Sequence, residues 1–556
     1  MKLRNLSLLV AATAALAACS DEDLGVVNLT SPDVERSLST PDGIEAILKN
    51  GFVQVFGATH GTTSALWPQA LVLSFESFGT VANNGMALRS SLPRVPIDNQ
   101  KGNQTAGENA RDFTQLALRG RNVNNAIRAL DALVAGGGGL GSTTANLRAR
   151  SFGFFSLALA NGEAALMYDS LGVITPNLES SDVPELSGYA AAMDTALMQL
   201  DTAIVVAQAA MAAGSLSLPN DWLRTVNTPV TGADYIKLLR SHKARLRAGV
   251  ARTPEERAAV DWAAVEADAA AGITEDFTLD LNSALGWGAS WVNQMANYTG
   301  WSSMPNFIAG FADTTSEFQA WLGTPINSRR PFLIRTPDKR WPSDSNNTTN
   351  AARLRAQQQA SSPTTAAVLP TVYFRNRPTG DDTPGVPYGD SYYDHARFRH
   401  YRVNSSVGPW IWMEKTENDM LRAEALIRLN RVPEAVPLIN ITRVVNGLPA
   451  ITAAGATAAT RVPPQPGGGA TSCVPRTPTG ASNALECGTV LEAMKWEKRM
   501  ETAWTGYSQW FIDGRGWGDF AVGTTYMWPV PYQEMDARVK PFYNSPWQTT
   551  ASTYGY

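Results

Sequence analysis

Apolar residues recur at helical spacing through the first half of the chain. Three stretches repeat them at intervals of three or four residues: 123–134, 193–204 and 235–250. This spacing places the apolar side chains on one face of an α-helix, which is buried by packing against other helices. His242 falls on the third of these faces, so we interpret it as a core residue. Strand-like alternation is scarce, and the pattern therefore predicts a mainly all-α protein.

The sequence also indicates where helices begin in the same half of the chain. Thr40 before Pro41, and Thr253 before Pro254, have the residue types of an N-cap and a first helical turn. Residues 148–169 form a further predicted helix with small residues that would permit close approach of a neighbour: Ala158, Ala160, Gly162, Ala164 and Ala165. Helix pairs joined by short turns suggest a helical-repeat scaffold, although no strict repeat consensus is present.

Helical periodicity fades between residues 276 and 407. Aromatic residues crowd into this region: Trp287, Trp291, Tyr298, Trp301, Phe307, Phe311, Trp321 and Trp341. Asn, Ser, Thr, Gly and Pro separate them, which predicts ordered loops with aromatic content. Residues 451–488 form a second irregular segment, rich in Ala, Thr, Pro and Gly.

The N-terminus has the three parts of a secretory signal. Lys2 and Arg4 precede an apolar run at residues 6–16, and small residues follow it up to Cys19. The run is too short to span a bilayer, which takes about 20 residues. Leu-Ala-Ala-Cys resembles the bacterial lipobox, in which the cysteine is acylated and becomes the new N-terminus; the alternative is an ordinary signal with a chance cysteine. We predict a signal peptide at 1–18 and a lipidated flexible tether at 19–40.

The charge and hydropathy of the chain limit the classes of partner to which it could bind. Loss of Lys2 and Arg4 with the signal peptide would change the formal net charge from −4 to −6, because two basic residues leave. An acidic balance gives no footprint for nucleic acid and no electrostatic grip on anionic lipid. Membrane attachment would then rest on the acyl chains. The longest further apolar stretch, 203–213, is interrupted by Gln208, so no other membrane span is expected.

The remaining cysteines, Cys473 and Cys487, flank a Pro/Gly-rich stretch. In an exported protein this spacing indicates a disulfide that closes a surface loop. Metal binding is the alternative, but the four histidines of the chain show no ligand spacing near these cysteines, and no metal or cofactor is expected.

Motifs in the last third carry a family resemblance. They are the Ala423–Leu426 helix, the turn 430–435 with Pro433, the helix end 446–449 with Gly447, the charged run 497–501, the aromatic-Asp-basic stretch 510–515, and Pro529-Val530-Pro531 with Asp536. Their order, together with the lipobox, resembles the SusD/RagB family of outer-membrane nutrient-binding lipoproteins. Two local departures are Thr505, where an acidic residue is usual, and a slightly long spacing from Gly506 to Trp510.

The charged run also has a physical interpretation of its own. Lys498 and Glu501 are three residues apart on one helix and can form an ion pair. We interpret the run as a solvated or structurally paired helix face rather than as catalytic. Asp513 and Arg515 flank glycines, and we expect them to tie a turn to that helix.

The resemblance implies a tetratricopeptide-like helical scaffold at 41–275 and 408–556, with a loop-rich ligand-binding insertion at 276–407. It further implies an outer-membrane lipoprotein facing the cell exterior. Such a protein binds a nutrient, usually an oligosaccharide, and delivers it to a TonB-dependent SusC-like transporter.

A sugar ring stacks on flat aromatic side chains while its hydroxyls bind polar groups, and tryptophan offers the largest apolar face with a polar edge. The expected ligand-binding residues are Trp287, Trp291, Tyr298, Trp301, Asn293 and Asn297, with Trp67, Asn83 and Asn84 in an early loop that could face the same site. The alternative is that these tryptophans fill the core.

Catalytic motifs are missing from the sequence. It has no Gly-x-Ser-x-Gly elbow, no Walker loop and no His-Glu-x-x-His. Acidic residues at 381, 382, 390 and 394 could bind calcium, but their spacing fits no calcium loop, so we interpret them as solvated. We expect a binding protein rather than an enzyme. The alternatives are a lipid-anchored all-α polysaccharide hydrolase or lyase, with a carboxylate pair across a cleft, and a helical-repeat assembly factor for envelope proteins.

Overall fold

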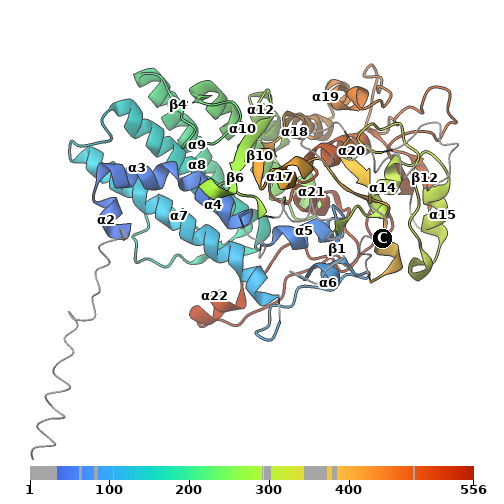
Figure 1. Cartoon of the computed structure of the whole chain (residues 1–556), viewed down its shortest axis with the longest axis horizontal. Helices are drawn as coiled ribbons and strands as arrows, with labels where there is room; N and C mark the ends of the chain where they lie inside the picture. Colours follow the sequence, from blue (N-terminus) through green and yellow to red (C-terminus); the bar gives the residue numbers. More distant parts are fainter. Residues whose placement is uncertain are drawn as a thin grey trace, which may run out of the picture.

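The computed structural model describes residues 34–61, 65–79, 85–103, 105–290, 292, 302–342, 372–377, 385–479 and 483–556. Long helices gather at one end of the molecule, and the aromatic-rich insertion with the C-terminal helices forms the other end (Figure 1). The scaffold helices of the first half are α2 (Val34–Leu38), α3 (Pro41–Lys49), α4 (Gly51–Thr59), α5 (Trp67–Leu73), α6 (Met86–Ser90), α7 (Ala106–Ala135), α8 (Thr143–Met167), α9 (Tyr189–Ala213), α10 (Gly232–Gly249), α11 (Pro254–Ala258) and α12 (Trp262–Ala270). The predicted all-α class is confirmed.

The two predicted helix N-caps are present in the structure. The Thr40 side chain accepts the N–H of Gly43 at the start of α3, and Thr253 accepts that of Glu256 at the start of α11. Capping satisfies backbone donors that have no partner inside the helix. α2 lies inside the stretch that was predicted to be a flexible tether. Its residue Leu38 packs against the core.

The apolar stripes lie in the core, apart from the exposed Val134 in the last turn of α7. The small residues of α8 permit the predicted close packing, since a Cβ on Gly162 would lie 2.8 Å from Leu246 of α10. His242 is buried and accepts the indole N–H of Trp412, so the core interpretation is confirmed.

Among the described residues, α9 is long and apolar enough to cross a bilayer, which differs from the expectation of no further span. Its apolar face packs on α8 and α10, which accounts for its composition equally well.

The insertion consists of short elements. They are β6 (Phe277–Asn282), η3 (Ser283–Leu285), β7 (Ser302–Ser303), α14 (Asn306–Ala309), η4 (Gly310–Ala312), α15 (Glu317–Gly323), η5 (Ile326–Ser328), β8 (Phe374–Asn376), η6 (Pro387–Gly389), β9 (Tyr393–His395), α17 (Arg399–Val403) and β10 (Val407–Met413). β6 pairs with β10, so the chain enters and leaves this region side by side. Phe307, Phe311, Trp321 and Trp341 are buried.

The remaining small sheets are also two-stranded and antiparallel. β1 (Phe78–Gly79) pairs with β7, β2 (Ser170–Gly172) with β3 (Leu186–Gly188), β4 (Ser217–Leu218) with β5 (Val230–Thr231), β8 with β9, and β11 (Arg476–Thr479) with β12 (Ala484–Cys487).

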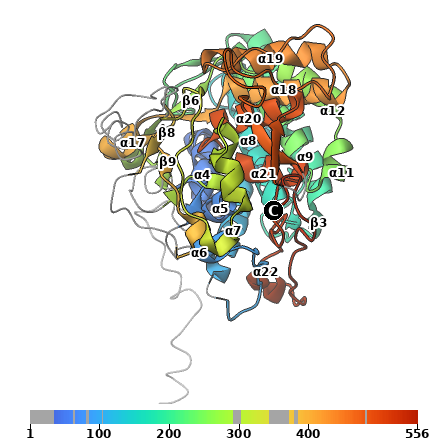
Figure 2. The same cartoon turned by 90° about the vertical axis from the view of Figure 1, so that its right-hand side faces the viewer.

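The C-terminal helices are α18 (Lys415–Arg428), α19 (Val432–Val445), α20 (Val490–Thr502), α21 (Gln509–Trp517) and α22 (Tyr532–Ala537). In Figure 2, α18 and α19 lie together at the top and α22 at the bottom. Gly447 follows the end of α19 with a φ of 81°, the left-handed conformation expected of a helix stop.

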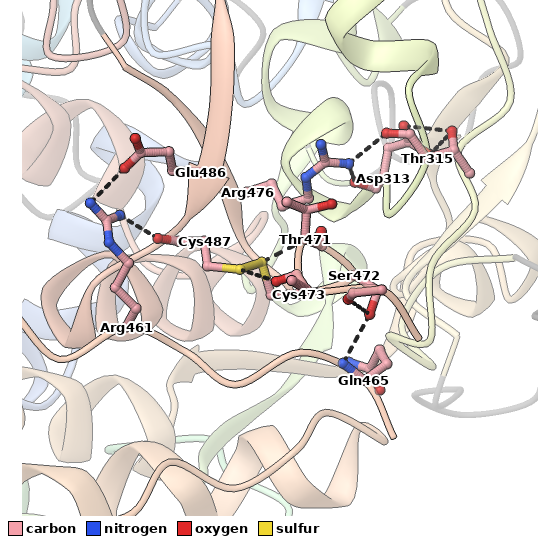
Figure 3. The surroundings of a disulfide bond; sticks show 12 residues. Asp313, Thr315, Arg461, Gln465, Thr471, Ser472, Cys473, Arg476, Glu486 and Cys487 are labelled. Carbon is pink, nitrogen blue, oxygen red and sulfur yellow. Dashed lines mark hydrogen bonds and ion pairs between the residues drawn. A yellow bond between two sulfur atoms is a disulfide. The ribbon is translucent and has the colours of Figure 1, made fainter. Parts of the chain in front are cut away.

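The predicted disulfide between Cys473 and Cys487 is present, with a Cα–Cα distance of 5.6 Å (Figure 3). It joins the strand-paired segment of β11 and β12 beside the buried Val474. Cys473 itself is buried rather than at the surface, because it belongs to the second core cluster under α18, α19 and α20.

The charged run of α20 is buried and ion-paired. Lys498 pairs with Asp513 of α21 at 2.7 Å, and Glu501 pairs with Arg340 of the insertion at 2.9 Å. The predicted pairing of Lys498 with Glu501 and the solvated alternative are therefore wrong, whereas the structurally paired alternative is confirmed. The stretch with Asp513 is a helix rather than a turn, and Asp513 does tie it to α20.

Candidate ligand-binding site

Two pairs of contacts bring the early loop and the middle loop together. The backbone N–H of Ser290 donates to His60 O at 2.8 Å, and its hydroxyl donates to Gly61 O at 3.0 Å. Farther along both segments, β1 pairs with β7 so that Gly79 faces Ser302. The residues that flank 62–64 and 80–84 thus adjoin those that flank 293–301. Whether the early loop faces the same site as the middle loop stays a prediction, because residues 80–84 and 293–301 lie outside the described residues.

Most of the predicted ligand contacts lie outside the described residues. These are Asn83, Asn84, Trp291, Asn293, Asn297, Tyr298 and Trp301. Their role stays a prediction, and the structure contributes the position of the segments that lead to them.

A groove of about 350 Å³ lies beside this meeting point. It is lined by one side of α4, by the polar face of α7, and by the turn after η3. The lining residues are Asn50, Val53, Gln54, Gly57, Ala58, Arg111, Gln115, Arg119, Leu285, Gly286 and Trp287. We call it the α4–α7 groove.

Trp287 is held by a tight turn. Its N–H donates to Asn282 O at 3.1 Å and its carbonyl accepts the N–H of Asn282 at 2.7 Å, with Gly286 between them at a φ of 80°. The ring stacks on Phe52 at a centroid distance of 5.8 Å and is 6% exposed. Trp287 is therefore a core residue whose edge lines the groove, rather than an open stacking platform.

The other side of the groove carries polar side chains of α7 that form hydrogen bonds. Gln115 and Arg119 are one turn apart on α7, and Arg119 Nη2 donates to Gln115 Oε1 at 3.1 Å. Arg111, one turn earlier, donates to Ala58 O and lies 3.6 Å from Asp112 Oδ1. Guanidinium and amide groups supply donors and an acceptor that suit a ligand with several hydroxyls. The sequence carries a signal for this face, because the three polar residues repeat at intervals of four.

Trp67 is placed differently from the prediction. It opens α5 instead of lying in a loop, and it is 1% exposed. Its ring packs on His60 at 4.9 Å and on Trp410 at 6.2 Å. Every residue of α5 is buried, so the indole fills the core and cannot contact a ligand.

Buried titratable groups lie beneath the groove. Burial raises the pKa of Asp112 to about 7 and that of Glu163 to about 8, even though Asp112 accepts the Tyr507 hydroxyl at 2.6 Å. Burial lowers the pKa of His60 to about 4. None of the three lines the groove, so we interpret the carboxyls as parts of the core, with Glu163 mostly protonated at neutral pH and Asp112 titrating near it.

Across the residues that the structure describes, no three His, Cys, Asp or Glu side chains are grouped to hold a metal ion. Asp394, predicted to be solvated, is instead buried against Arg375 at 2.7 Å. Asp381 and Asp382 lie outside the described residues.

No protein-family model matches the sequence, and no curated protein matches it by sequence. Solved structures match its fold. A SusD homologue from Parabacteroides distasonis aligns over 85% of this chain and 84% of its own, with a TM-score of 0.52 and 11% identity. A SusD-like protein from Bacteroides fragilis aligns over 93% and 98%, with a TM-score of 0.51 and 13% identity.

The chain has a SusD-like fold. A third match is the surface glycan-binding protein A from Bacteroides thetaiotaomicron, over 92% of this chain and 99% of that one, with a TM-score of 0.50 and 11% identity. The alignments with the second and third of these proteins span almost the full length of each.

Proposed function

We propose that this protein is a surface lipoprotein that binds a glycan between the early and middle loops and passes it to a TonB-dependent transporter. The observation that carries the proposal is the meeting of the two loop segments beside the α4–α7 groove. Amide residues of the early loop, and aromatic and amide residues of the middle loop, would then converge on one ligand with the polar face of α7.

Further support comes from three sources. The lipobox at Cys19 provides a membrane anchor and an export route. One match to the SusD-like fold is described as a surface glycan-binding protein. The groove combines hydrogen-bonding side chains with an indole edge, which is the chemistry that a sugar requires.

An array of glycans and peptides, probed with the purified protein, tests the proposal. We expect saturable binding to a glycan with no release of product. Binding to peptides alone would favour the assembly-factor alternative. Shortening of the bound glycan would favour the lipid-anchored enzyme.

Substitution in the groove gives a quantitative test. We expect Arg119→Ala to weaken glycan binding by about tenfold or more, since a hydrogen bond from a charged donor contributes about 1.5–3 kcal/mol, and Gln115→Ala to weaken it by a few-fold, since a neutral hydrogen bond contributes about 0.5–1.5 kcal/mol. Isothermal titration calorimetry measures the change. Gln208→Ala is the matched control, because Gln208 is exposed on α9 away from the groove. Equal affinity of the Arg119 and Gln208 variants would place the ligand elsewhere.

The delivery step has its own test. We expect a large β-barrel to co-purify with the lipidated protein from membranes, and Cys19→Ala to abolish membrane retention. A Cys19→Ala protein that still fractionates with the outer membrane would contradict lipid anchoring.

A further inference from the structure

An exposed apolar loop follows α22. Residues 539–547, which we call the apolar loop, carry Val539, Phe542, Tyr543 and Trp547. Val539 is 92% exposed, and the three aromatic side chains are each about 40% exposed. α22 lies at the lower edge of the molecule in both views (Figures 1 and 2). Four large apolar side chains in nine residues are unusual for a surface facing water.

Neighbouring segments enlarge this surface. Lys540 Nζ lies 3.6 Å from Glu185 Oε2, which joins the loop to the segment with the exposed Val183. α22 and the same segment line a shallow hollow of about 200 Å³ together with the exposed Leu118 of α7. The apolar surface therefore draws on three parts of the chain.

Hydrogen bonds with Asn99 and Asp169 hold the apolar loop in place. The Asn99 side-chain amide donates to Tyr543 O at 3.0 Å, and the Asn99 backbone N–H donates to Asn544 Oδ1 at 2.9 Å. The Tyr543 hydroxyl donates to Asp169 Oδ1 at 2.9 Å. Val539 has a φ of 55°, a strained conformation for a β-branched residue. Fixed backbone, strain and exposed apolar atoms together indicate a surface shaped for contact rather than for stability.

The charges around the loop cancel one another. Arg538 pairs with Glu534 at 2.7 Å, and Lys101 pairs with Asp536 at 2.6 Å. Lys540 has its own partner in Glu185. The surface thus offers no excess positive charge to an anionic partner. Its attraction is apolar, with Trp and Tyr, the residues that favour the boundary between lipid tails and water.

The lipid anchor places this surface near a bilayer. Fourteen residues lie between Cys19 and Val34, where α2 begins, so the tether reaches at most about 50 Å. α2 and α22 both contact α7; in Figure 1, α2 lies at the left end of the body and α22 at its lower edge. A lipid at Cys19 therefore keeps the apolar loop within reach of the membrane.

We propose that the apolar loop inserts into the interface of the lipid bilayer and fixes the orientation of the body on the membrane. The inference rests on the proposed lipidation of Cys19. Acyl chains retain the protein but leave it free to tumble on its tether. A second, rigid contact through the loop removes that freedom.

Fluorescence quenching by lipid tests this insertion. The lipidated protein is reconstituted into phosphatidylcholine vesicles with and without bromine on the acyl chains, beside the Trp547→Phe variant. The difference between the two proteins isolates Trp547. We expect brominated lipid to reduce the Trp547 emission by about twofold, with no effect of added salt because the contact is apolar.

Two further variants sharpen the result. Val539→Ser combined with Phe542→Ser should restore the Trp547 emission. Val445→Trp adds a tryptophan on the exposed apolar face of α19 and should stay unquenched, because that face carries no tether.

Vesicle flotation separates the possible failures. A protein that does not float contradicts the lipidation and overturns the proposal with it. A protein that floats and binds glycan, but whose Trp547 emission is unchanged by brominated lipid, overturns the insertion alone. Protection of the loop only after a protein partner is added would assign this surface to that partner instead.

Discussion

Replacing Arg257 by methionine should lower the free energy of unfolding by about 3–5 kcal/mol. Arg257 is completely buried between two carboxylates, with Nη2 at 2.6 Å from Glu424 and 3.0 Å from Asp513. Burial opposes ionisation of Glu424, but Arg257 outweighs it and holds the pKa of that carboxyl at about 2. Without the guanidinium, the buried Glu424 would keep, among the described residues, only the more distant Arg428 at 3.4 Å as an ion-pair partner, and Asp513 would keep only Lys498.

Chemical denaturation measures this loss. Arg431→Met is the matched control, because Arg431 and Glu434 form an exposed pair whose removal should cost under about 1 kcal/mol. If the Arg257 and Arg431 variants lost similar stability, the buried pairs would not hold α11, α18 and α21 together as described.

Replacing Glu163 by glutamine should change the pH dependence of stability. Burial raises the pKa of Glu163 from 4.5 to about 8, although Arg245 of α10 and Thr59 of α4 act in the opposite direction. The folded protein therefore holds a proton that the unfolded chain releases, so stability falls as pH rises from about 4.5 to 8. The glutamine variant lacks this loss, and we expect it to gain about 3 kcal/mol over the parent protein at pH 8.

Urea titrations from pH 4 to 8 check the prediction. The two proteins should be similar near pH 4 and diverge as pH rises. Asp112 of α7 faces Glu163 and titrates in the same direction in both proteins, so the difference between the curves isolates Glu163. Asp131→Asn, at an exposed position of α7, should show no such divergence. A constant difference at every pH would contradict the assignment.

The scaffold was predictable because its signals are local. Thr40 and Thr253 cap helices as their sequence context indicates, and the stripe that contains His242 is buried as its spacing requires. Each signal extends over a few residues and needs no knowledge of the rest of the chain.

The long-range features were not predictable in the same way. A charged run such as that of α20 has one spacing whether it faces water or buried partners. Its true partners are Asp513 of the next helix and Arg340, which is 161 residues away from Glu501 in sequence. The β6–β10 pairing was missed for the same reason, since a strand that contains Pro409 is recognised only once its partner is known.

The candidate site likewise has features that the sequence predicted and features that it did not. The early loop was predicted to be able to face the same site as the middle loop, and the contacts of Ser290 and Gly79 bring the flanks of the two loops together. Trp67 was wrongly predicted to lie in a ligand-binding loop, because the residue type alone does not show whether a tryptophan is buried or exposed. Gln115 and Arg119 were not predicted, because the apolar stripe of α7 marks its buried face, whereas the groove uses its polar face.

The most direct test of a non-catalytic glycan receptor on a SusD-like fold is a calorimetric titration with the strongest glycan from the array, followed by mass spectrometry of the recovered ligand. We predict one saturable binding event per protein, weakened by Arg119→Ala, and a glycan of unchanged mass. Recovery of a shortened glycan, or binding that Arg119→Ala leaves intact, would contradict the account.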